Sequence, residues 1–580
     1  MKDNDKSVNL YRELDSLAHA WQGRLTFGLS PSALMRAYFD WVIHLANAPG
    51  KQFELIEGSL LSAMRCWMYS IQAAVDPECP VCEQPLPQDK RFIGEGWQQW
   101  PYNVSYQSFL LIQRWWENAT TDVPGVSLNN QRLISFAARQ ILDIFAPTNF
   151  LTTNPEVSRV TGEQVGANIL RGFFNLMEDW QRYINRKPPV GTEDFKVGKN
   201  LGITPGKVIF RNRLIELIQY SPSTKNAYLE PIMIVPAWIM KYYILDLSPQ
   251  NSLVKYFVDK GHTVFMISWK NPGTEDRDLG MADYLNLGVM TGIDVISTIL
   301  PETKINAMGY CLGGTLLTIA AAAMSRDGDE RLRSLTLLAA QTDFTEAGEL
   351  MLFIDESQMN YLEDAMREQG YLNTKQMAGA FQLLRSKDLI WSRVIQDYLL
   401  GERKPMFDLM AWNADATRMP FRMHSEYLRC LFLNNDLFEG RYEVDGHPIA
   451  ISDIHIPVFL VATIKDHVAP WRSVYKFNLS SDAEELTFVL TSGGHNAGIL
   501  SYPSHPYRRY QISTRKEGEK YIDLETWLKT TPVIKGSWWI PWQEWLAERS
   551  SGQVPPPLMG APKKGYTPLY DAPGSYVLEE

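Results

Sequence analysis

Short apolar runs rich in β-branched residues recur along the chain from residue 231 onward. Near-continuous hydrophobicity over so few positions indicates strands that are covered on both faces, as in a parallel sheet. Helical patterns separate several of these runs, most clearly at 312–325. The alternation predicts an α/β fold with a doubly wound, mostly parallel sheet. The runs are 231–239, 261–269, 305–310, 334–340, 457–466 and 486–495.

The segments that lie outside this alternation of strands and helices have a helical pattern of apolar residues. Apolar residues recur every three or four positions in stretches such as 32–46 and 166–184, which predicts a helical N-terminal domain over 1–195. A catalytic domain is predicted over 196–550, with a helical cap inserted at about 342–455, where strands give way to segments such as 376–400. The Pro/Gly-rich end of the chain, 551–580, is predicted to be an irregular tail.

Composition excludes several classes of protein. The 580 residues carry a formal net charge of −10, so no nucleic acid is expected as a partner. No apolar run of about 18 residues is present, and the opening residues lack a signal-peptide pattern, so neither a transmembrane segment nor secretion is expected. Five cysteines give no disulfide framework, which fits a reducing cytoplasm. Cys79 and Cys82 form a lone C-x-x-C, and no metal site is expected there.

The candidate chemistry begins with Gly-Tyr-Cys-Leu-Gly at 309–313, where a predicted strand meets a predicted helix. The sequence has the G-x-nucleophile-x-G form of a nucleophile elbow, with Cys311 in place of serine. Gly309 and Gly313 are small, as the tight turn requires, and the helix N-terminus stabilises a thiolate. This arrangement makes the predicted fold α/β-hydrolase-like.

In such folds the acid and then the histidine follow the nucleophile in the chain. Asp466 ends one predicted strand and His495 ends the next, and both lie at the carboxyl edge of a parallel sheet. The order Cys311, Asp466, His495 therefore predicts a catalytic triad. His495 would act as the base, and Asp466 would orient it and stabilise its charge.

Other residues compete for these roles. His467 follows Asp466 directly, so its side chain is expected to point away from the site. His262 is expected to be structural, and His455 to lie on the surface. Asp453 precedes its strand instead of following it, which disfavours it as the acid.

The oxyanion donors are expected to be backbone N–H groups. Leu312 directly follows the nucleophile and supplies the first donor. The second is expected from the loop after the strand at 231–239, at either Ala237 or Trp238. Asp246 and the tyrosines before it are expected to pack this loop.

Cysteine in place of serine favours acyl transfer from a thioester. Attack of a thiolate on a thioester is nearly thermoneutral, and the acyl group then passes downhill from sulfur to a hydroxyl. The triad therefore suits a transferase that moves an acyl group from an acyl-CoA to an alcohol. A thioesterase, with water as the acceptor, stays open.

Many separated stretches resemble class I poly(3-hydroxyalkanoate) synthases, over most of the chain from about residue 90 to 580. These matches are more specific than an elbow alone. The stretches are 146–156, 201–212, 216–222, 241–254, 261–273, 309–315, 407–417, 465–471, 492–498, 536–539 and 572–577.

The resemblance implies polymerisation of (R)-3-hydroxyacyl-CoA, usually 3-hydroxybutyryl-CoA, into a polyester with release of CoA and without a cofactor. It implies that Cys311 carries the acyl group, that His495 is its base, and that Asp466 orients His495 or helps to activate the 3-hydroxyl. It also implies a homodimer at the surface of cytoplasmic polymer granules, with phasins as partners. A thioesterase or depolymerase with the same triad, or an inactive granule-associated homologue, are the alternatives.

The chain departs from the family pattern at several positions. Ala237 replaces a proline and Met240 an asparagine in the expected oxyanion loop. In the expected cap, Lys387 replaces an asparagine, and Ser392 and Arg393 replace an Asn-Tyr pair. These changes leave the preferred acyl length open.

Overall fold

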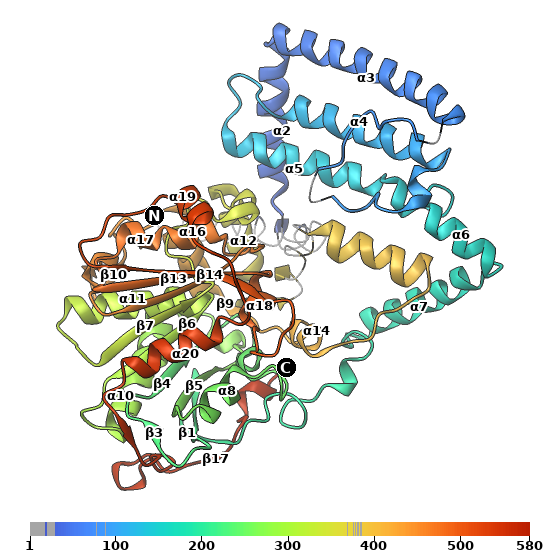
Figure 1. Ribbon diagram of the computed structural model, residues 1–580. Helices are drawn as coiled ribbons and strands as arrows, with labels where there is room; N and C mark the ends of the chain where they lie inside the picture. Colours follow the sequence, from blue (N-terminus) through green and yellow to red (C-terminus); the bar gives the residue numbers. More distant parts are fainter. Residues whose placement is uncertain are drawn as a thin grey trace, which may run out of the picture. The chain divides into compact units, whose positions relative to one another are not determined.

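The computed structural model describes residues 29–76, 78–86, 89–367, 369–374 and 385–580, with single residues at 15, 18, 19, 22, 376, 377, 379 and 382 (Figure 1). Most of the predicted N-terminal residues before 29, and part of the predicted helical segment 376–400, lie outside the described residues. The chain forms two compact units. Unit 1 contains 1–21, 191–377 and 406–580, and unit 2 contains 22–190 and 378–405.

The core of unit 1 is a sheet of eleven strands. The predicted apolar runs form its centre, where neighbouring strands are parallel, and the α/β prediction is confirmed. In spatial order the parallel strands are β13 (Glu485–Thr491), β12 (Val458–Thr463), β7 (Leu332–Leu338), β6 (Ile305–Tyr310), β4 (Ile232–Val235) and β5 (Val264–Trp269).

Antiparallel strands flank this centre on both sides, and the apolar pattern did not predict them. Polar residues interrupt these strands, as Glu216 and Gln219 do in β2, although every residue of β2 is buried. Beyond β5 lie β2 (Ile215–Tyr220), β1 (Gly206–Arg211) and β17 (Tyr570–Asp571), and beyond β13 lie β14 (Arg509–Lys516) and β15 (Ile534–Lys535).

Helices cover the sheet. Helix α11 (Leu312–Arg326) follows β6 and packs on it, with every residue buried as far as Met324. Helix α20 (Trp539–Glu548) packs through Trp542, whose indole N–H donates to the Thr336 hydroxyl of β7 at 3.1 Å. Because the parallel strands are apolar on both faces, these helices complete the core.

Helical segments are also inserted between β7 and β12, as the sequence predicts for a cap. Unit 1 keeps part of the insertion. These segments are η7 (Gly348–Phe353), α12 (Glu356–Arg367), α14 (Asp408–Asn413), α15 (Phe421–Glu426) and the π-helical turn η10 (Tyr427–Leu433). The rest, 378–405, groups with unit 2, so the predicted cap is divided between the units.

Unit 2 is helical. Within it, η9 (Val394–Leu399) crosses α7 (Ala167–Ile184), where a Cβ on Gly172 would lie 1.8 Å from the carbonyl oxygen of Tyr398. The Asn175 side chain also donates to the Asp397 carbonyl at 2.9 Å. The other helices are α2 (Pro31–Ala46), α3 (Pro49–Val75), α4 (Tyr102–Thr120), α5 (Leu128–Ile144) and α6 (Pro155–Glu163), with η8 (Lys387–Trp391).

The departures at Lys387 and Arg393 form ion pairs inside unit 2. Lys387 lies 3.2 Å from the buried carboxylate of Asp89, and Arg393 lies 2.7 Å from Asp179. Both residues therefore support the packing of 378–405 on the N-terminal helices.

The C-terminal tail is ordered by polar contacts with the sheet. Glu216 of β2 is fully buried and accepts hydrogen bonds from the backbone N–H groups of Ser575 and Tyr576. The Lys241 ammonium donates to the carbonyl oxygens of Val577 at 2.7 Å and Glu579 at 2.6 Å. The end of the tail is thus tied to the loop that contains Ala237 and Trp238.

Candidate active site

Cys311 occupies the turn between β6 and α11. Its backbone has φ 53° and ψ −125°, a left-handed conformation that non-glycine residues rarely adopt. The Cys311 N–H donates to the carbonyl oxygen of Leu338 on β7 at 2.9 Å, which holds the corner against the sheet. The predicted nucleophile elbow is therefore present, and backbone strain of this kind is typical of functional sites.

The glycines around Cys311 permit a close approach of backbone to backbone. A Cβ on Gly309 would lie 2.4 Å from the Cα of Gly314. A Cβ on Gly313 would lie 2.2 Å from the carbonyl oxygen of Val235 and 2.5 Å from that of Pro236. A side chain at Gly309 would therefore clash within the elbow itself, and a side chain at Gly313 would push the elbow away from the loop that follows β4.

Asp466 and His495 form a hydrogen-bonded pair at the carboxyl ends of neighbouring strands β12 and β13. Nδ1 of His495 lies 2.8 Å from Oδ2 of Asp466. The other carboxylate oxygen accepts the N–H groups of Val468 at 2.9 Å and Ala469 at 2.8 Å. Because Nδ1 is held by the acid, Nε2 is the nitrogen left for proton transfer.

The electrostatics of the pair favour the charged forms. Burial opposes protonation of His495, but the charge of Asp466 and the interaction with Cys311 outweigh it and raise the pKa of His495 well above its ordinary value. Burial would raise the pKa of Asp466, but the charge of His495 and the hydrogen bonds lower it. A side-chain hydrogen bond with Cys311 is among the interactions that raise the pKa of His495, so the thiol and the imidazole lie close together.

Tyr310 supports the histidine from the elbow side. Its ring stacks on His495, with centroids 5.7 Å apart and planes at 29°. Its hydroxyl donates to Oδ1 of Asn496 at 2.6 Å. Asn496 in turn lies 3.5 Å from the Asn413 side chain of the cap segment α14. Only the fold places Tyr310 beside His495, so the sequence pattern indicates no such role.

Three of the competing residues lie elsewhere. His262 precedes β5 at the opposite edge of the sheet, stacks on Tyr228 at 4.5 Å, and its pKa is lowered to about 3 by burial. Nδ1 of His455 lies 3.3 Å from the carbonyl oxygen of Asp482. Asp453 ends a short 3₁₀ turn before β12, and the structure pairs His495 with Asp466 instead.

The expected oxyanion loop lies against the elbow. Gly313 lies against the carbonyl groups of Val235 and Pro236. Ala237 and Trp238 follow directly in the chain, so they lie close to the first turn of α11, whose first residue is Leu312. The loop is fixed from the cap side, because the Thr417 hydroxyl donates to the Trp238 carbonyl at 2.7 Å. This position suits the expected second donor but leaves the choice between Ala237 and Trp238 open.

An aromatic residue of the cap also reaches the site. Burial raises the pKa of Tyr427 well above its ordinary value, and the charge of Cys311 adds to the effect, so Tyr427 lies near the sulfur. Its ring is 6.2 Å from Trp238, edge to face, and 6.4 Å from Phe344. Tyr427 is distant from Cys311 in the chain, and nothing in the sequence pattern indicates this proximity.

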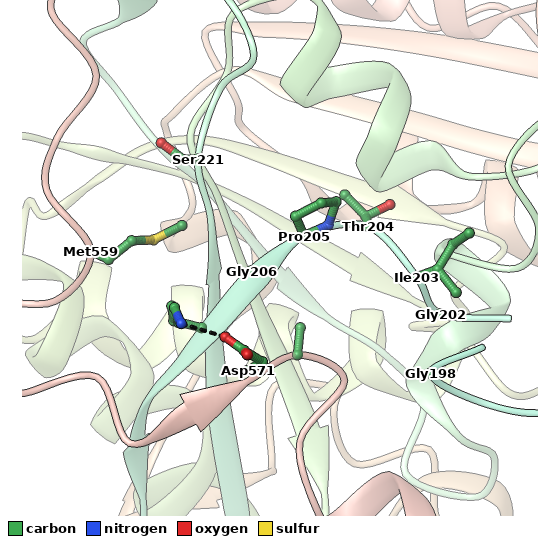
Figure 2. Close-up of a pocket in the computed structure, with 11 residues that line it drawn as sticks. Gly198, Gly202, Ile203, Thr204, Pro205, Gly206, Ser221, Met559 and Asp571 are labelled. Atoms are coloured by element: carbon green, nitrogen blue, oxygen red, sulfur yellow. Dashed lines mark hydrogen bonds and ion pairs between the residues drawn. The ribbon is translucent and has the colours of Figure 1, made fainter. Parts of the chain in front are cut away.

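A separate cavity of about 440 Å³ lies beside the start of β1 (Figure 2). It is lined by Gly206 and Ser221, among others, and Gly206 pairs with Tyr220, which pairs with Val264 at the start of β5. The cavity therefore lies at the amino edge of the parallel strands, opposite Cys311. Its two charged lining residues, Lys207 and Asp571, pair with each other.

The described residues contain no group of three or more His, Cys, Asp or Glu side chains arranged to hold a metal ion. Cys82 donates its thiol hydrogen to the Gln107 side chain at 3.0 Å, and Cys79 packs against Tyr69. Within the same part of the chain, no helix combines the length and apolar character needed to cross a membrane.

The sheet, the elbow and the following acid and base define a protein of the α/β-hydrolase fold with cysteine at the nucleophile position. Family models agree with this class. An alpha/beta hydrolase fold model matches residues 230–502. Models described as "Poly-beta-hydroxybutyrate polymerase N terminal" and "Poly-beta-hydroxybutyrate polymerase (PhaC) N-terminus" match 9–51 and 88–257.

Relatives of known name cover most of the chain. A poly(3-hydroxyalkanoate) polymerase of Methylorubrum extorquens is 41% identical over 85% of this chain and 81% of its own. The corresponding polymerase subunit of Rhizobium meliloti is 39% identical over 98% and 94%. That of Cupriavidus necator is 34% identical over 84% and 83%. The chain belongs to the poly(3-hydroxyalkanoate) polymerase family and is an enzyme of the acyltransferase type.

Proposed function

We propose that this enzyme polymerises (R)-3-hydroxyacyl-CoA, with 3-hydroxybutyryl-CoA as the substrate to test first, through an acyl group carried by Cys311. The observation that supports the proposal most directly is the elbow at Cys311 beside the His495–Asp466 pair. The membership of the polymerase family supports the choice of substrate. The mechanism needs no metal ion or cofactor.

In the first half of the reaction the Cys311 thiolate attacks the thioester carbonyl of the hydroxyacyl-CoA. The backbone N–H of Leu312 and that of Ala237 or Trp238 stabilise the oxyanion. The bond between carbon and the CoA sulfur breaks while the bond to Sγ of Cys311 forms. The departing CoA thiolate takes the proton from the His495 imidazolium.

In the second half the 3-hydroxyl of an incoming hydroxyacyl-CoA is the nucleophile. His495 takes its proton while the oxygen attacks the acyl carbon on Cys311. An ester bond forms, the bond to Sγ breaks, and the thiolate is restored. The lengthened hydroxyacyl-CoA then acylates Cys311 again and releases CoA, so each added unit releases one CoA.

The first test is Cys311→Ala with 3-hydroxybutyryl-CoA, following CoA release and polymer formation together. We expect both to fall to background, because the acyl carrier is lost. Retained turnover in the variant would remove Cys311 as the nucleophile. If the wild type released CoA and free hydroxy acid without polymer, the enzyme would be a thioesterase instead.

We also propose that the enzyme works as a homodimer at the surface of polymer granules, where phasins are the expected partners. Unit 2 supports this proposal because its helices expose apolar side chains. On α7 alone, Phe173, Phe174 and Trp180 are 53%, 61% and 58% exposed. Large exposed apolar faces mark surfaces for apolar partners, and a polyester is such a partner.

A further inference from the structure

Trp238 carries a buried hydrogen-bond donor that the mechanism above does not use. Its side chain is 1% exposed, and its indole Nε1 has no hydrogen-bond partner among the described residues. An unpaired buried donor lowers stability, so such groups are rare in native proteins and call for an explanation. A ligand that accepts a hydrogen bond from Nε1 of Trp238 would explain the unpaired donor.

The position of Trp238 connects this donor with the reacting acyl group. The residue belongs to the loop that Gly313 of the elbow touches through Val235 and Pro236. The proposed oxyanion donors would hold the acyl carbonyl against this loop. Two bonds further along the acyl group is C3, whose oxygen distinguishes a hydroxyacyl group from a plain fatty acyl group.

The surroundings of Trp238 are otherwise aromatic. Its ring lies 5.6 Å from that of Tyr284 and 6.2 Å from that of Tyr427. Tyr427 also lies near the sulfur of Cys311, so the tryptophan and the nucleophile share a neighbour. In so apolar a setting a single polar donor discriminates strongly, because a ligand without an acceptor leaves the donor unpaired.

We propose that the indole N–H of Trp238 hydrogen-bonds the oxygen on C3 of the acyl group carried by Cys311, and thereby selects 3-hydroxyacyl over unsubstituted acyl thioesters. The inference rests on the proposed function of Cys311. In the first unit this oxygen is a free hydroxyl, and in a growing chain it is the ester oxygen. Trp238 is thus a specificity-determining residue of the acyl pocket.

The test compares (R)-3-hydroxybutyryl-CoA with butyryl-CoA, which lacks the C3 oxygen. The rate of CoA release in the first turnover is measured for each substrate, and acylation of Cys311 is checked by mass spectrometry of the intact protein. The ratio of the two rates is the measure of preference. In Trp238→Phe we expect the preference for the hydroxyacyl substrate to fall about tenfold.

Phenylalanine also removes volume, so a second variant separates the hydrogen bond from packing. Replacement of Trp238 by 3-benzothienylalanine keeps the fused ring and exchanges only the N–H for sulfur. The matched control is the same replacement at Trp527, which is also buried but donates its N–H to the Ser513 hydroxyl at 2.6 Å. The control should keep the wild-type preference.

An unchanged preference in the benzothienyl variant at Trp238 would overturn the inference and leave a weak contact with a neighbouring ring as the role of the N–H. A wild-type enzyme that forms no acyl group on Cys311 from either substrate would instead remove the proposed function. A preference that falls in the Trp238 variant but not in the Trp527 control would support the inference.

Discussion

The central sheet of unit 1 and the helices of unit 2 bury their apolar residues to very different extents. Every position of β4, β5, β6 and β12 is buried. By contrast, only three residues of the 27-residue helix α3 and two of the 18-residue helix α7 are buried. The sheet is a closed core that tolerates little change, whereas the helices keep apolar surface available for a partner.

The largest effect expected inside the closed core comes from Asp466, the proposed acid of the triad. Asp466→Asn keeps the shape of the side chain but removes the charge that orients and stabilises His495. We expect kcat to fall by about a thousandfold to ten-thousandfold, as in other triads. Asp453→Asn, at an acid that precedes β12 and lies outside the proposed triad, is the matched control and should keep the wild-type kcat.

The same variant has a pH signature. Asp466 helps to raise the pKa of His495, so in Asp466→Asn the alkaline limb of kcat/KM should move to lower pH. The stability that His495 gains from its raised pKa is complete below its ordinary value of 6.5, and that of Asp466 is complete above 3.8. The Tm advantage of the wild type should therefore be largest between pH 3.8 and 6.5. If the alkaline limb does not move, Asp466 does not raise the pKa of the group that acts as the base.

Two glycine-to-alanine substitutions, one in each region, allow a direct comparison of their packing. In Gly313→Ala the new methyl group would meet backbone oxygens at 2.2 and 2.5 Å, and we expect a loss of up to about 3 kcal/mol in unfolding free energy. In Gly58→Ala, within α3, nothing lies within 4 Å of the new methyl group. That variant should gain up to about 1 kcal/mol, because alanine favours helix.

Denaturant unfolding of both variants measures the contrast. If Gly313→Ala and Gly58→Ala lost equal amounts of unfolding free energy, α3 would be as closely packed as the elbow. In Gly313→Ala the activity should fall further than the stability, because the loop with Ala237 and Trp238 would move away from Cys311.

The contrast also explains what the sequence could predict. The parallel strands are recognisable because both faces are buried, so their apolar runs are continuous. The proposed triad could be predicted because a tight turn demands Gly309 and Gly313, and because the acid and base follow in a fixed order. These features depend on local chemistry and on strand order alone.

Features that depend on distant contacts could not be predicted. Strand β2 contains Glu216, which reads as polar, but it is fully buried because the C-terminal tail supplies its hydrogen-bond donors. Residues 378–405 continue the helical pattern of the cap, yet they group with unit 2. The approach of Tyr427 to Cys311 is likewise set by tertiary packing.

A smaller effect is expected from the Tyr310–Asn496 hydrogen bond behind the base. Asn496→Leu leaves the buried Tyr310 hydroxyl without its acceptor, and we expect it to cost about 1–3 kcal/mol. Tyr310→Phe should cost less, because the half-buried Asn496 keeps Asn413 nearby. In the double variant no polar group is left unpaired, so its loss should be smaller than the sum of the single losses.

The measurements for this double-mutant cycle are the unfolding free energy and kcat of the wild type, the two single variants and the double variant. Strictly additive losses would show that the hydrogen bond does not couple the two residues. The stacking of Tyr310 on His495 is retained in Tyr310→Phe, so the pH dependence of kcat/KM should change little in that variant.

Substitutions on the exposed face of helix α7 in unit 2 should have the smallest effect on stability. They should have a large effect on binding to the polymer. Replacing Phe173, Phe174 and Trp180 of α7 by serine removes exposed apolar surface, so unfolding free energy should change by no more than about 0.5 kcal/mol at each position. Binding to poly(3-hydroxybutyrate) particles, measured by co-sedimentation, should fall at least tenfold if this surface meets the polymer. The control replaces Tyr507, Val533 and Leu558 of unit 1, which are 85%, 60% and 83% exposed. Equal losses of binding in both triple variants would mean that any exposed apolar residue serves, and that the contrast between the two units has no role in association.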